Sequence, residues 1–300
     1  IADLTDAEQY APDNDNSDRT KMTKTVAQAM LAKVYAEKEV QDYDKVIAYA
    51  DKVMNTTGVE LEDSYETLWG YDETAKDCMK RNTKEGILEV HWTTGSGNWE
   101  TWMYGRQLDN WDYNFTWAKW ITPSRDIIND FDKEGDEVRK NQAIVYYACT
   151  WSNYYPASNY PFMYKLRSSY NNIYWVRLAD IILMKAEAEA YKGNLAESAK
   201  LVNQIRKRAK LKELTSDKTG SKESMIEAVL HERRLELAFE GERWFDLCRN
   251  NKVEQYLNGI DNRDSGRIRQ VRQFDGNSYL LPIPQTALDQ NTNLEQNPGY

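Results

Sequence analysis

Apolar residues recur at intervals of three and four near the start of the chain, and this pattern predicts two helices joined as a hairpin. The first helix is expected from Thr20 to Tyr35 and the second from Tyr43 to Met54, each with one apolar stripe. Gly58 follows the second stripe and is expected to supply a left-handed stop. The residues expected to face inward are Met22, Val26, Ala29, Met30, Val34, Val46, Ile47, Ala50, Val53 and Met54.

Helical periodicity returns at Tyr174 and predicts three more helices. The first carries a stripe that begins with Trp175 and Leu178 and ends at Gly193. Asn194 and Glu197 then have the spacing of a capping box for the second helix. The third is expected to run unbroken from about Ser224 to Arg249, with these apolar residues: Ile226, Val229, Leu230, Leu237, Ala238 and Phe245.

The middle of the chain, from about 64 to 170, lacks this periodicity and is rich in Gly, Asn, Trp and Tyr. It is expected to form loops and short strands, with a strand over 86–92 and a helix over 124–131. The strip 279–284 contains two prolines and is expected to be extended. The fold class predicted is therefore mainly α, with tetratricopeptide-like helical hairpins at both ends and a loop-rich, aromatic-rich insert between them.

Aromatic residues concentrate in one part of that insert. Residues 92–120 hold nine aromatic side chains in 29 positions, where the chain average of 12% predicts about 3.5, and six of the ten tryptophans lie there. Flat rings with few rotatable bonds suit the C–H faces of sugars. The insert is therefore a candidate carbohydrate site, although packing of half or more of these rings beneath loops is the competing interpretation. The residues assigned to sugar contact are Trp99, Trp102, Trp111 and Tyr113, with Asp109 and Arg106 as hydrogen-bonding partners of hydroxyl groups.

Composition and charge exclude several classes of function. The chain has 39 basic and 48 acidic residues, a formal net charge of -9, which is unsuited to neutralising nucleic-acid phosphates. The longest uncharged apolar runs, such as Ile181 to Met184, are too short to cross a membrane. Three cysteines form neither a metal-binding pattern nor an even disulfide framework, so no metal or other cofactor is expected.

Catalysis and calcium binding are alternatives that the sequence disfavours. Glu100 with Asp109 or Asp112 could form a glycosidase pair, but such pairs arise by chance among 48 acids. The chain has two histidines and no Gly-x-Ser-x-Gly motif, so the prediction is that it is not an enzyme. Residues 130–137 imitate the start of a calcium loop, yet Asn141 stands where a bidentate glutamate is required, so a solvated acidic turn is expected.

A row of glutamates near the end of the predicted long helix requires compensation. Glu232, Glu236 and Glu240 lie one above another at four-residue steps, so their charges repel unless cations approach from other elements. An interhelical ion-pair network is therefore expected. The residues that could supply the cations are Arg177, Arg206 and Arg208.

Four ordered runs resemble the SusD/RagB family of nutrient-binding lipoproteins: 175–188 (WVRLADIILMKAEA), 201–209 (LVNQIRKRA), 232–247 (ERRLELAFEGERWFDL), and the strip at 281–284 with the ending NPGY at 297–300. The match continues upstream through residues 18–31. The resemblance implies a single SusD-like domain over 1–300, with a helical hairpin at 20–57, a ligand-binding insert at 60–172, and helical repeats with the C-terminal strip at 173–300. Members usually carry a lipobox cysteine and a further N-terminal third, so the N-terminal part is expected to be missing.

The resemblance also implies a function and partners. Such a protein captures oligosaccharides or polysaccharides at the cell surface and delivers them to a TonB-dependent, SusC-like transporter in the outer membrane. It would contact the membrane only through a lipid anchor that this sequence lacks. The alternative from a different class is a helical-repeat scaffold that docks protein or peptide, with the aromatic side chains internal.

Overall fold

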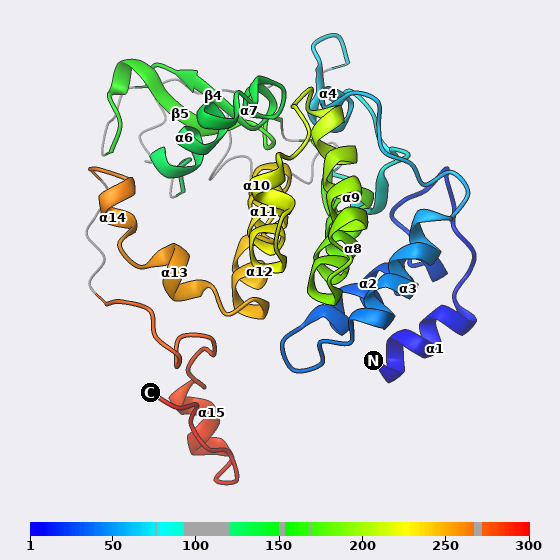
Figure 1. Cartoon of the computed structure of the whole chain (residues 1–300), viewed down its shortest axis with the longest axis vertical. Helices are drawn as coiled ribbons and strands as arrows, with labels where there is room; N and C mark the ends of the chain where they lie inside the picture. The colour runs from blue at the N-terminus through cyan, green and yellow to red at the C-terminus, as the bar shows by residue number, and fades with distance from the viewer. Residues whose placement is uncertain (76, 93–120, 150–153, 169, 267–271) are drawn as a thin grey trace. The chain divides into compact units, whose positions relative to one another are not determined.

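Helices provide most of the regular structure, and the strands are short. The computed structural model describes residues 1–75, 77–92, 121–149, 154–168, 170–266 and 272–300. These divide into two units, 1–243 and 244–300 (Figure 1). The helices of the first unit are α1 (Ala2–Tyr10), α2 (Lys24–Ala36), α3 (Tyr43–Met54), α4 (Tyr65–Trp69), α6 (Arg125–Glu134), α7 (Glu137–Ala143), η1 (Ala157–Asn159), α8 (Leu178–Lys192), α9 (Leu195–Arg208), α10 (Ser216–Thr219) and α11 (Lys222–Glu236). Those of the second are α12 (Arg243–Arg249, which starts at the boundary), α13 (Val253–Leu257), α14 (Ile260–Arg263) and α15 (Gln285–Gln290).

The strands at described positions form three antiparallel pairs. They are β1 (Tyr71–Asp72) with β2 (Asp77–Cys78), β3 (Gly86–Val90) with β6 (Ile173–Arg177), and β4 (Ile144–Tyr147) with β5 (Tyr160–Met163). In the β3–β6 pair Val90 lies opposite Ile173 and Gly86 lies opposite Arg177. The strand expected over 86–92 is therefore confirmed as β3.

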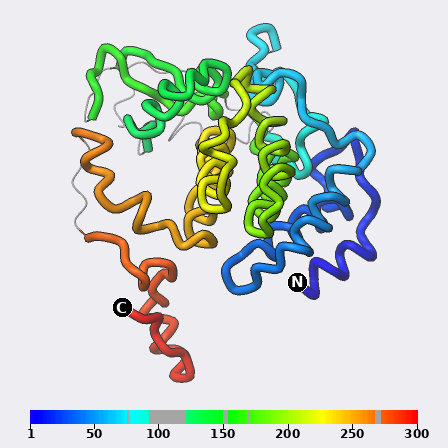
Figure 2. The backbone as a smooth tube through the Cα atoms, in the orientation of Figure 1, coloured from blue at the N-terminus to red at the C-terminus, as the bar shows by residue number. Residues whose placement is uncertain are grey.

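Two helical hairpins and α11 form the main body of the first unit. α3 packs against both α2 and α8, and α8 packs in turn against α9 and α11 (Figure 2). Side-chain caps fix the starts of α2 and α3, because Thr23 accepts from the Val26 N–H and Asp42 accepts from the Lys45 N–H. The hairpin predicted at the start of the chain is confirmed, with α3 at the predicted bounds. Met22 is a correction: it precedes the cap of α2 and is 66% exposed.

Helix α8 is the centre of this body. Twelve of its fifteen residues are buried, so it is covered on all sides rather than along one stripe. Most of its apolar residues belong to the largest buried cluster, which also includes side chains of α2, α3, α9 and α11, whereas Met184 and Ala188 belong to a second cluster with α2 and α3. The helix ends where predicted, since Gly193 adopts φ +85°, a left-handed conformation that glycine tolerates without strain. The tetratricopeptide-like, mainly helical fold is thus confirmed.

Two predictions for this region are wrong. Residues 173–177 form strand β6 and not the first turn of a helix, because they pair with β3, 83 positions earlier along the chain. The capping box at Asn194 and Glu197 does not form. Asn194 is the residue before α9, but its side-chain amide donates to Glu189 Oε2 at 2.7 Å and makes no cap hydrogen bond.

The long helix predicted from Ser224 to Arg249 is also wrong, because α11 ends at Glu236. The backbone carbonyl of Glu236 accepts hydrogen bonds from Tyr65 Oη at 2.8 Å, Arg177 Nη2 at 2.8 Å and Lys165 Nζ at 3.1 Å. Side-chain donors from other segments thus take the place of the backbone N–H group that a further helical turn would have supplied to this carbonyl. Phe239 (φ +66°) and Gly241 (φ +89°) then carry the chain through a left-handed turn to α12, where Phe245 is 55% exposed.

In the second unit, the strip that contains two prolines is free of helix, as predicted. Its backbone is held by side chains from the end of the chain. Gln296 accepts from the Ile283 N–H at 2.8 Å and donates to the Ile283 carbonyl at 2.9 Å, and Tyr300 Oη donates to the Leu280 carbonyl at 3.0 Å. Helix α15 begins directly after Pro284.

Candidate functional site

Two described parts of the chain flank the aromatic segment, and we call them its anchors. The N-terminal anchor is β3 with the turn before it, up to residue 92, and the C-terminal anchor is α6 with the loop before it, from residue 121. The residues assigned to sugar contact, Trp99, Trp102, Arg106, Asp109, Trp111 and Tyr113, all lie outside the described residues. The assignment therefore remains a prediction, and the geometry that bears on it is that of the anchors.

Glu89, on strand β3, holds the N-terminal anchor together. Its side chain is fully buried and accepts from the Asn82 N–H at 3.0 Å and from the Thr83 N–H and Oγ1 at 2.9 Å each. His91 Nε2 lies 2.7 Å from the same carboxylate. A buried carboxylate with this many donors fixes the strand and the turn before it.

Arg81 fastens the chain at the residue where the aromatic segment begins. Its Nη2 donates to the carbonyls of Trp92 and Tyr170 and to Asp77 Oδ1, each at 2.9 Å. Three segments of the chain are joined by one guanidinium, which can supply several donors at once.

The C-terminal anchor is built on helix α6. Ser124 accepts from the Ile127 N–H and caps the helix, as the predicted start near this residue requires. The Arg125 guanidinium lies 4.7 Å and 4.1 Å from the ring centroids of Tyr154 and Tyr155, and its Nη2 donates to the Tyr154 carbonyl at 2.6 Å. Tyr155 Oη donates in turn to the Pro123 carbonyl at 2.7 Å, so the loop before α6 is also fixed.

Trp175 is an exposed aromatic residue that the sequence analysis placed in a buried stripe. It lies on β6, 63% exposed, between the buried residues Tyr174 and Val176. The alternation of side chains along a strand explains this pattern. The run Ile-Tyr-Trp-Val-Arg at 173–177 is rich in β-branched and aromatic residues, and this was the available signal for a strand.

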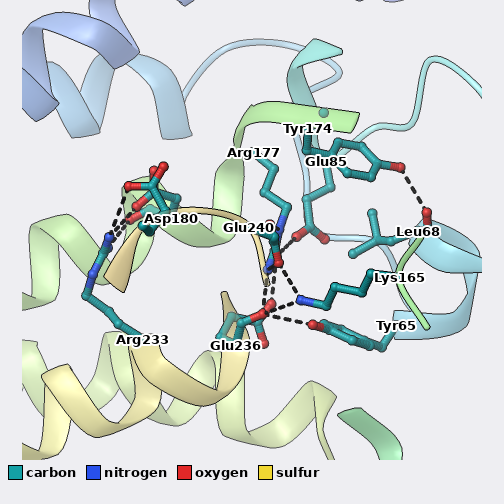
Figure 3. Close-up of polar contacts among 12 residues, drawn as sticks. Tyr65, Leu68, Glu85, Lys165, Tyr174, Arg177, Asp180, Arg233, Glu236 and Glu240 are labelled. Atoms are coloured by element: carbon teal, nitrogen blue, oxygen red, sulfur yellow. Dashed lines mark hydrogen bonds and ion pairs between the residues drawn. The ribbon is translucent and has the colours of Figure 1, made fainter. Parts of the chain in front are cut away.

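A buried ion-pair network holds the end of β6 in place (Figure 3). Arg177, the last residue of β6, donates to Glu240 Oε2, Glu236 Oε1 and Glu85 Oε1 at 2.7, 2.7 and 2.8 Å. Arg206 pairs with Glu232 at 3.0 Å, and Arg208 pairs with Glu85 and Glu236. The network predicted for the glutamate row is confirmed, with all three arginines in the predicted role.

Two further cations of the network were not predicted from the sequence. Arg139, on α7, is fully buried and lies 2.7 Å from Glu232 and 3.2 Å from Glu236. Lys165 lies 2.5 Å from Glu240 and 4.7 Å from the ring of Trp69. Both come from the segment without helical periodicity, where no pattern indicates which side chains reach the core.

Inside this network, burial and neighbouring charges shift the pKa values of the side chains in opposite directions. Burial alone would raise the pKa of the Glu236 carboxyl, but the guanidinium groups of Arg208, Arg177 and Arg139 hold it well below its usual range. Burial lowers the pKa of the Lys165 ammonium to about 8, and the attraction of Glu240 offsets only part of that effect. The network thus holds charged groups within the frame, where each is paired with an opposite charge.

The acidic turn at 130–137 is engaged in structural contacts. Asp130 pairs with Arg234, and Asp132 pairs with Lys140. Asp136 is fully buried, caps α7 and pairs with Arg139 at 2.5 Å, so the expectation of a solvated turn is wrong for this residue. Among the described residues there is no group of three or more His, Cys, Asp or Glu side chains placed to hold a metal ion.

Both histidines lie against carboxylates that belong to other networks. His91 contacts Glu89 at 2.7 Å, and His231 contacts Glu134 at 3.1 Å. The hydrogen bond from His231, with the nearby Arg206, lowers the pKa of Glu134 to about 2.

The glycosidase pair considered above, Glu100 with Asp109 or Asp112, lies outside the described residues. In the parts of the chain that the structure describes, no helix has the length and apolar character needed to span a membrane.

Comparisons with known proteins agree on one family. The model of the SusD family matches residues 9–300. SusD-like protein P2 of Formosa agariphila is 27% identical over all of this chain, which spans 64% of that relative's length. SusD-like protein P38 of the same organism is 36% identical over 43% of this chain and 25% of its own length. The chain therefore spans less than two thirds of the length of either relative.

Solved structures share the fold. A SusD superfamily protein from Bacteroides vulgatus superposes with a TM-score of 0.75 at 23% identity, over 100% of this chain and 67% of its own. A laminarin-binding SusD-like protein superposes with a TM-score of 0.70 at 23% identity, over 100% of this chain and 68% of its own. At these sequence identities, the similarity to the two structures shows a shared fold and nothing further.

Proposed function

Because this chain belongs to the SusD family, we propose that it binds carbohydrate and that the aromatic segment 92–120 forms the binding surface. The observation that carries the proposal is the concentration of nine aromatic side chains in those 29 positions. Trp99, Trp102, Trp111 and Tyr113 stack against sugar faces, and Asp109 and Arg106 bond to hydroxyl groups.

The anchors on either side support this role. Buried contacts hold both ends of the segment on a rigid frame. They are the ion pairs of Arg177, the hydrogen bond from Arg81 to the Trp92 carbonyl, and the stacking of Arg125 on the ring of Tyr155. A frame of this kind lowers the entropy that a surface loses when it binds a flexible glycan. A glycan that repeats the same unit gains further affinity by engaging several copies of the protein at once.

The proposal includes a location and a partner. The protein acts at the outer surface of the outer membrane, attached through a lipid anchor, and passes glycans to a TonB-dependent, SusC-like transporter. The family resemblance supports this part. Co-purification of the protein with a co-expressed SusC-like, TonB-dependent receptor from the same organism tests the partnership, and separate elution of the two would count against it.

We further propose that the protein binds glycans without cleaving them. The sequence supports this, because it has only two histidines and no Gly-x-Ser-x-Gly motif. Incubation with each polysaccharide below, followed by an assay for new reducing ends, tests this. Release of reducing ends above that of a heat-treated sample would indicate a glycosidase.

Affinity electrophoresis tests the binding proposal. The protein is run through gels that contain laminarin, amylopectin, xylan, pectin or yeast mannan. Retardation by at least one polysaccharide is expected. Trp102→Ala and Trp111→Ala should each lower the affinity about tenfold, equivalent to about 1.4 kcal/mol. Tyr10→Ala is the matched control, because Tyr10 is an exposed aromatic residue on α1, and it should leave the affinity unchanged.

Quenching of tryptophan fluorescence by acrylamide separates this function from that of a protein-docking scaffold. Rings at a sugar-binding surface should be quenched readily, and the polysaccharide that retards the protein should protect them. Complete shielding without ligand, together with no retardation in any gel, would support the scaffold instead.

A further inference from the structure

One face of the β3–β6 sheet presents apolar side chains in a row. Val90 and Ile173 lie opposite each other, and both are half-buried. Trp175 lies at a register shift of the pair, between Tyr174 opposite Glu89 and Val176 opposite Leu88. Tyr174 and Val176 are buried whereas Ile173 is half-buried and Trp175 exposed, so Trp175 lies on the same, outer side as Ile173. In the other direction along the sheet, the half-buried Trp92 follows two residues after Val90. β3 ends at Val90, so Trp92 lies just beyond the strand, where the aromatic segment begins.

The backbone beneath Trp175 is fixed on both sides. The ring of Tyr174 packs edge-on against Trp69 with centroids 5.1 Å apart, and its hydroxyl donates to the Leu68 carbonyl at 3.3 Å (Figure 3). Arg177 is held by the buried network described above. The indole is therefore mounted on a strand that cannot shift without breaking buried contacts.

The exposure of Trp175 distinguishes it from the other tryptophans that the structure describes. Trp69 is buried, and Trp92 and Trp244 are half-buried, whereas Trp175 is 63% exposed. A large flat ring on a rigid strand offers a sugar face a partner at little entropic cost, since only two side-chain torsions need to be fixed.

We propose that Trp175 is a second stacking platform for carbohydrate, outside the aromatic segment, and that a bound glycan continues from Trp92 along this face of the β3–β6 sheet. This inference rests on the proposed function. It adds a preference in chain length: glycans long enough to reach from the aromatic segment to Trp175 bind more tightly than short ones. Val90 and Ile173 form the apolar floor between the two indoles.

The experiment compares affinity across chain lengths. The probes are the polysaccharide of the five that retards the native protein and size-fractionated oligosaccharides from its partial acid hydrolysis, measured by calorimetry. Trp175→Ala should lower the affinity for the longest fractions about tenfold and change that for the shortest by less than twofold. Trp175→Phe should recover most of the loss, because a ring is restored. Tyr10→Ala is again the control for an exposed aromatic side chain.

The outcomes separate the two proposals. Unchanged affinity of Trp175→Ala at every length, with a loss in Trp111→Ala, overturns the second platform and leaves the aromatic segment as the site. An equal loss at every length in Trp175→Ala also overturns the inference, because the residue would then act on the whole site. A native protein that none of the five polysaccharides retards overturns both. Melting temperatures within 2 °C of the native protein are required of each variant, and Trp175→Thr, which has no ring but suits a strand, replaces Trp175→Ala if the latter melts lower.

Discussion

Arg177 joins the end of β6 to the end of α11 through Glu236. Its Nη1 donates to Glu236 Oε1 at 2.7 Å and its Nη2 donates to the Glu236 carbonyl at 2.8 Å. One guanidinium therefore neutralises a buried carboxylate and satisfies the last carbonyl of a helix. Since β6 also carries Trp175, this contact connects the helical frame to the exposed face of the sheet.

Removal of the Glu236 charge should destabilise the protein strongly. Glu236→Gln leaves Arg177, Arg208 and Arg139 with less compensation inside the protein, and loss of one partner of a buried pair costs about 3 kcal/mol. Urea denaturation at pH 7 measures the free energy of unfolding. Lys200→Ala, which removes an exposed pair with Glu197, is the control and should have no measurable effect. Equal effects of the two substitutions would contradict the structural role of the network.

The same network should make the protein sensitive to acid. In the folded state, nearby arginines lower the pKa of Glu236. His231 and Arg206 lower the pKa of Glu134. Stability from these groups is fully present above about pH 4.5, their unfolded value, and is lost as the pH falls through the folded values. Urea denaturation between pH 7 and pH 3 should show a decline below pH 4.5. The decline should be shallower in Glu236→Gln, and parallel curves for the two proteins would count against this cause.

On the alkaline side, Lys165 should make the protein more stable as the pH rises. Its folded pKa is about 8, below the ordinary 10.5, so the folded protein releases this proton first. Between pH 8 and 10.5 the unfolded chain binds more protons at this position, and the contribution to stability rises by about 1.4 kcal/mol per pH unit. The quantity to measure is the difference in unfolding free energy between the native protein and Lys165→Met, because contributions common to the two proteins cancel. A difference that stays constant over this range would contradict the prediction.

Arg81 should influence ligand binding through the backbone of Trp92. Arg81→Met removes the hydrogen bonds to the Trp92 and Tyr170 carbonyls, with an expected loss of about 2 kcal/mol in stability. Retardation by polysaccharide should weaken as well, even at temperatures where the variant is folded, because the start of the aromatic segment is released. Circular dichroism provides the melting temperature, and affinity electrophoresis 20 °C below it provides the binding. Full retardation under those conditions would exclude a positioning role for Arg81.

Local patterns determined several features of this protein without reference to the rest of the fold. The bounds of α3, the start of α6 at Ser124 and the left-handed end of α8 at Gly193 all follow from a cap or a periodicity within a few residues. Glu232 and Glu236 on α11 likewise required cations, because like charges four residues apart on a helix repel.

The tertiary structure alone decided the features that depend on distant partners. Residues 173–177 could extend a helical stripe or form a strand, and pairing with β3, 83 positions earlier, settles the choice and turns Trp175 outward. Helix α11 stops at Glu236 because Tyr65, Lys165 and Arg177 supply donors to its last carbonyl. A sequence encodes local conformational preference directly, but pairing across tens of residues depends on which surfaces meet, and that is fixed only when the whole chain packs.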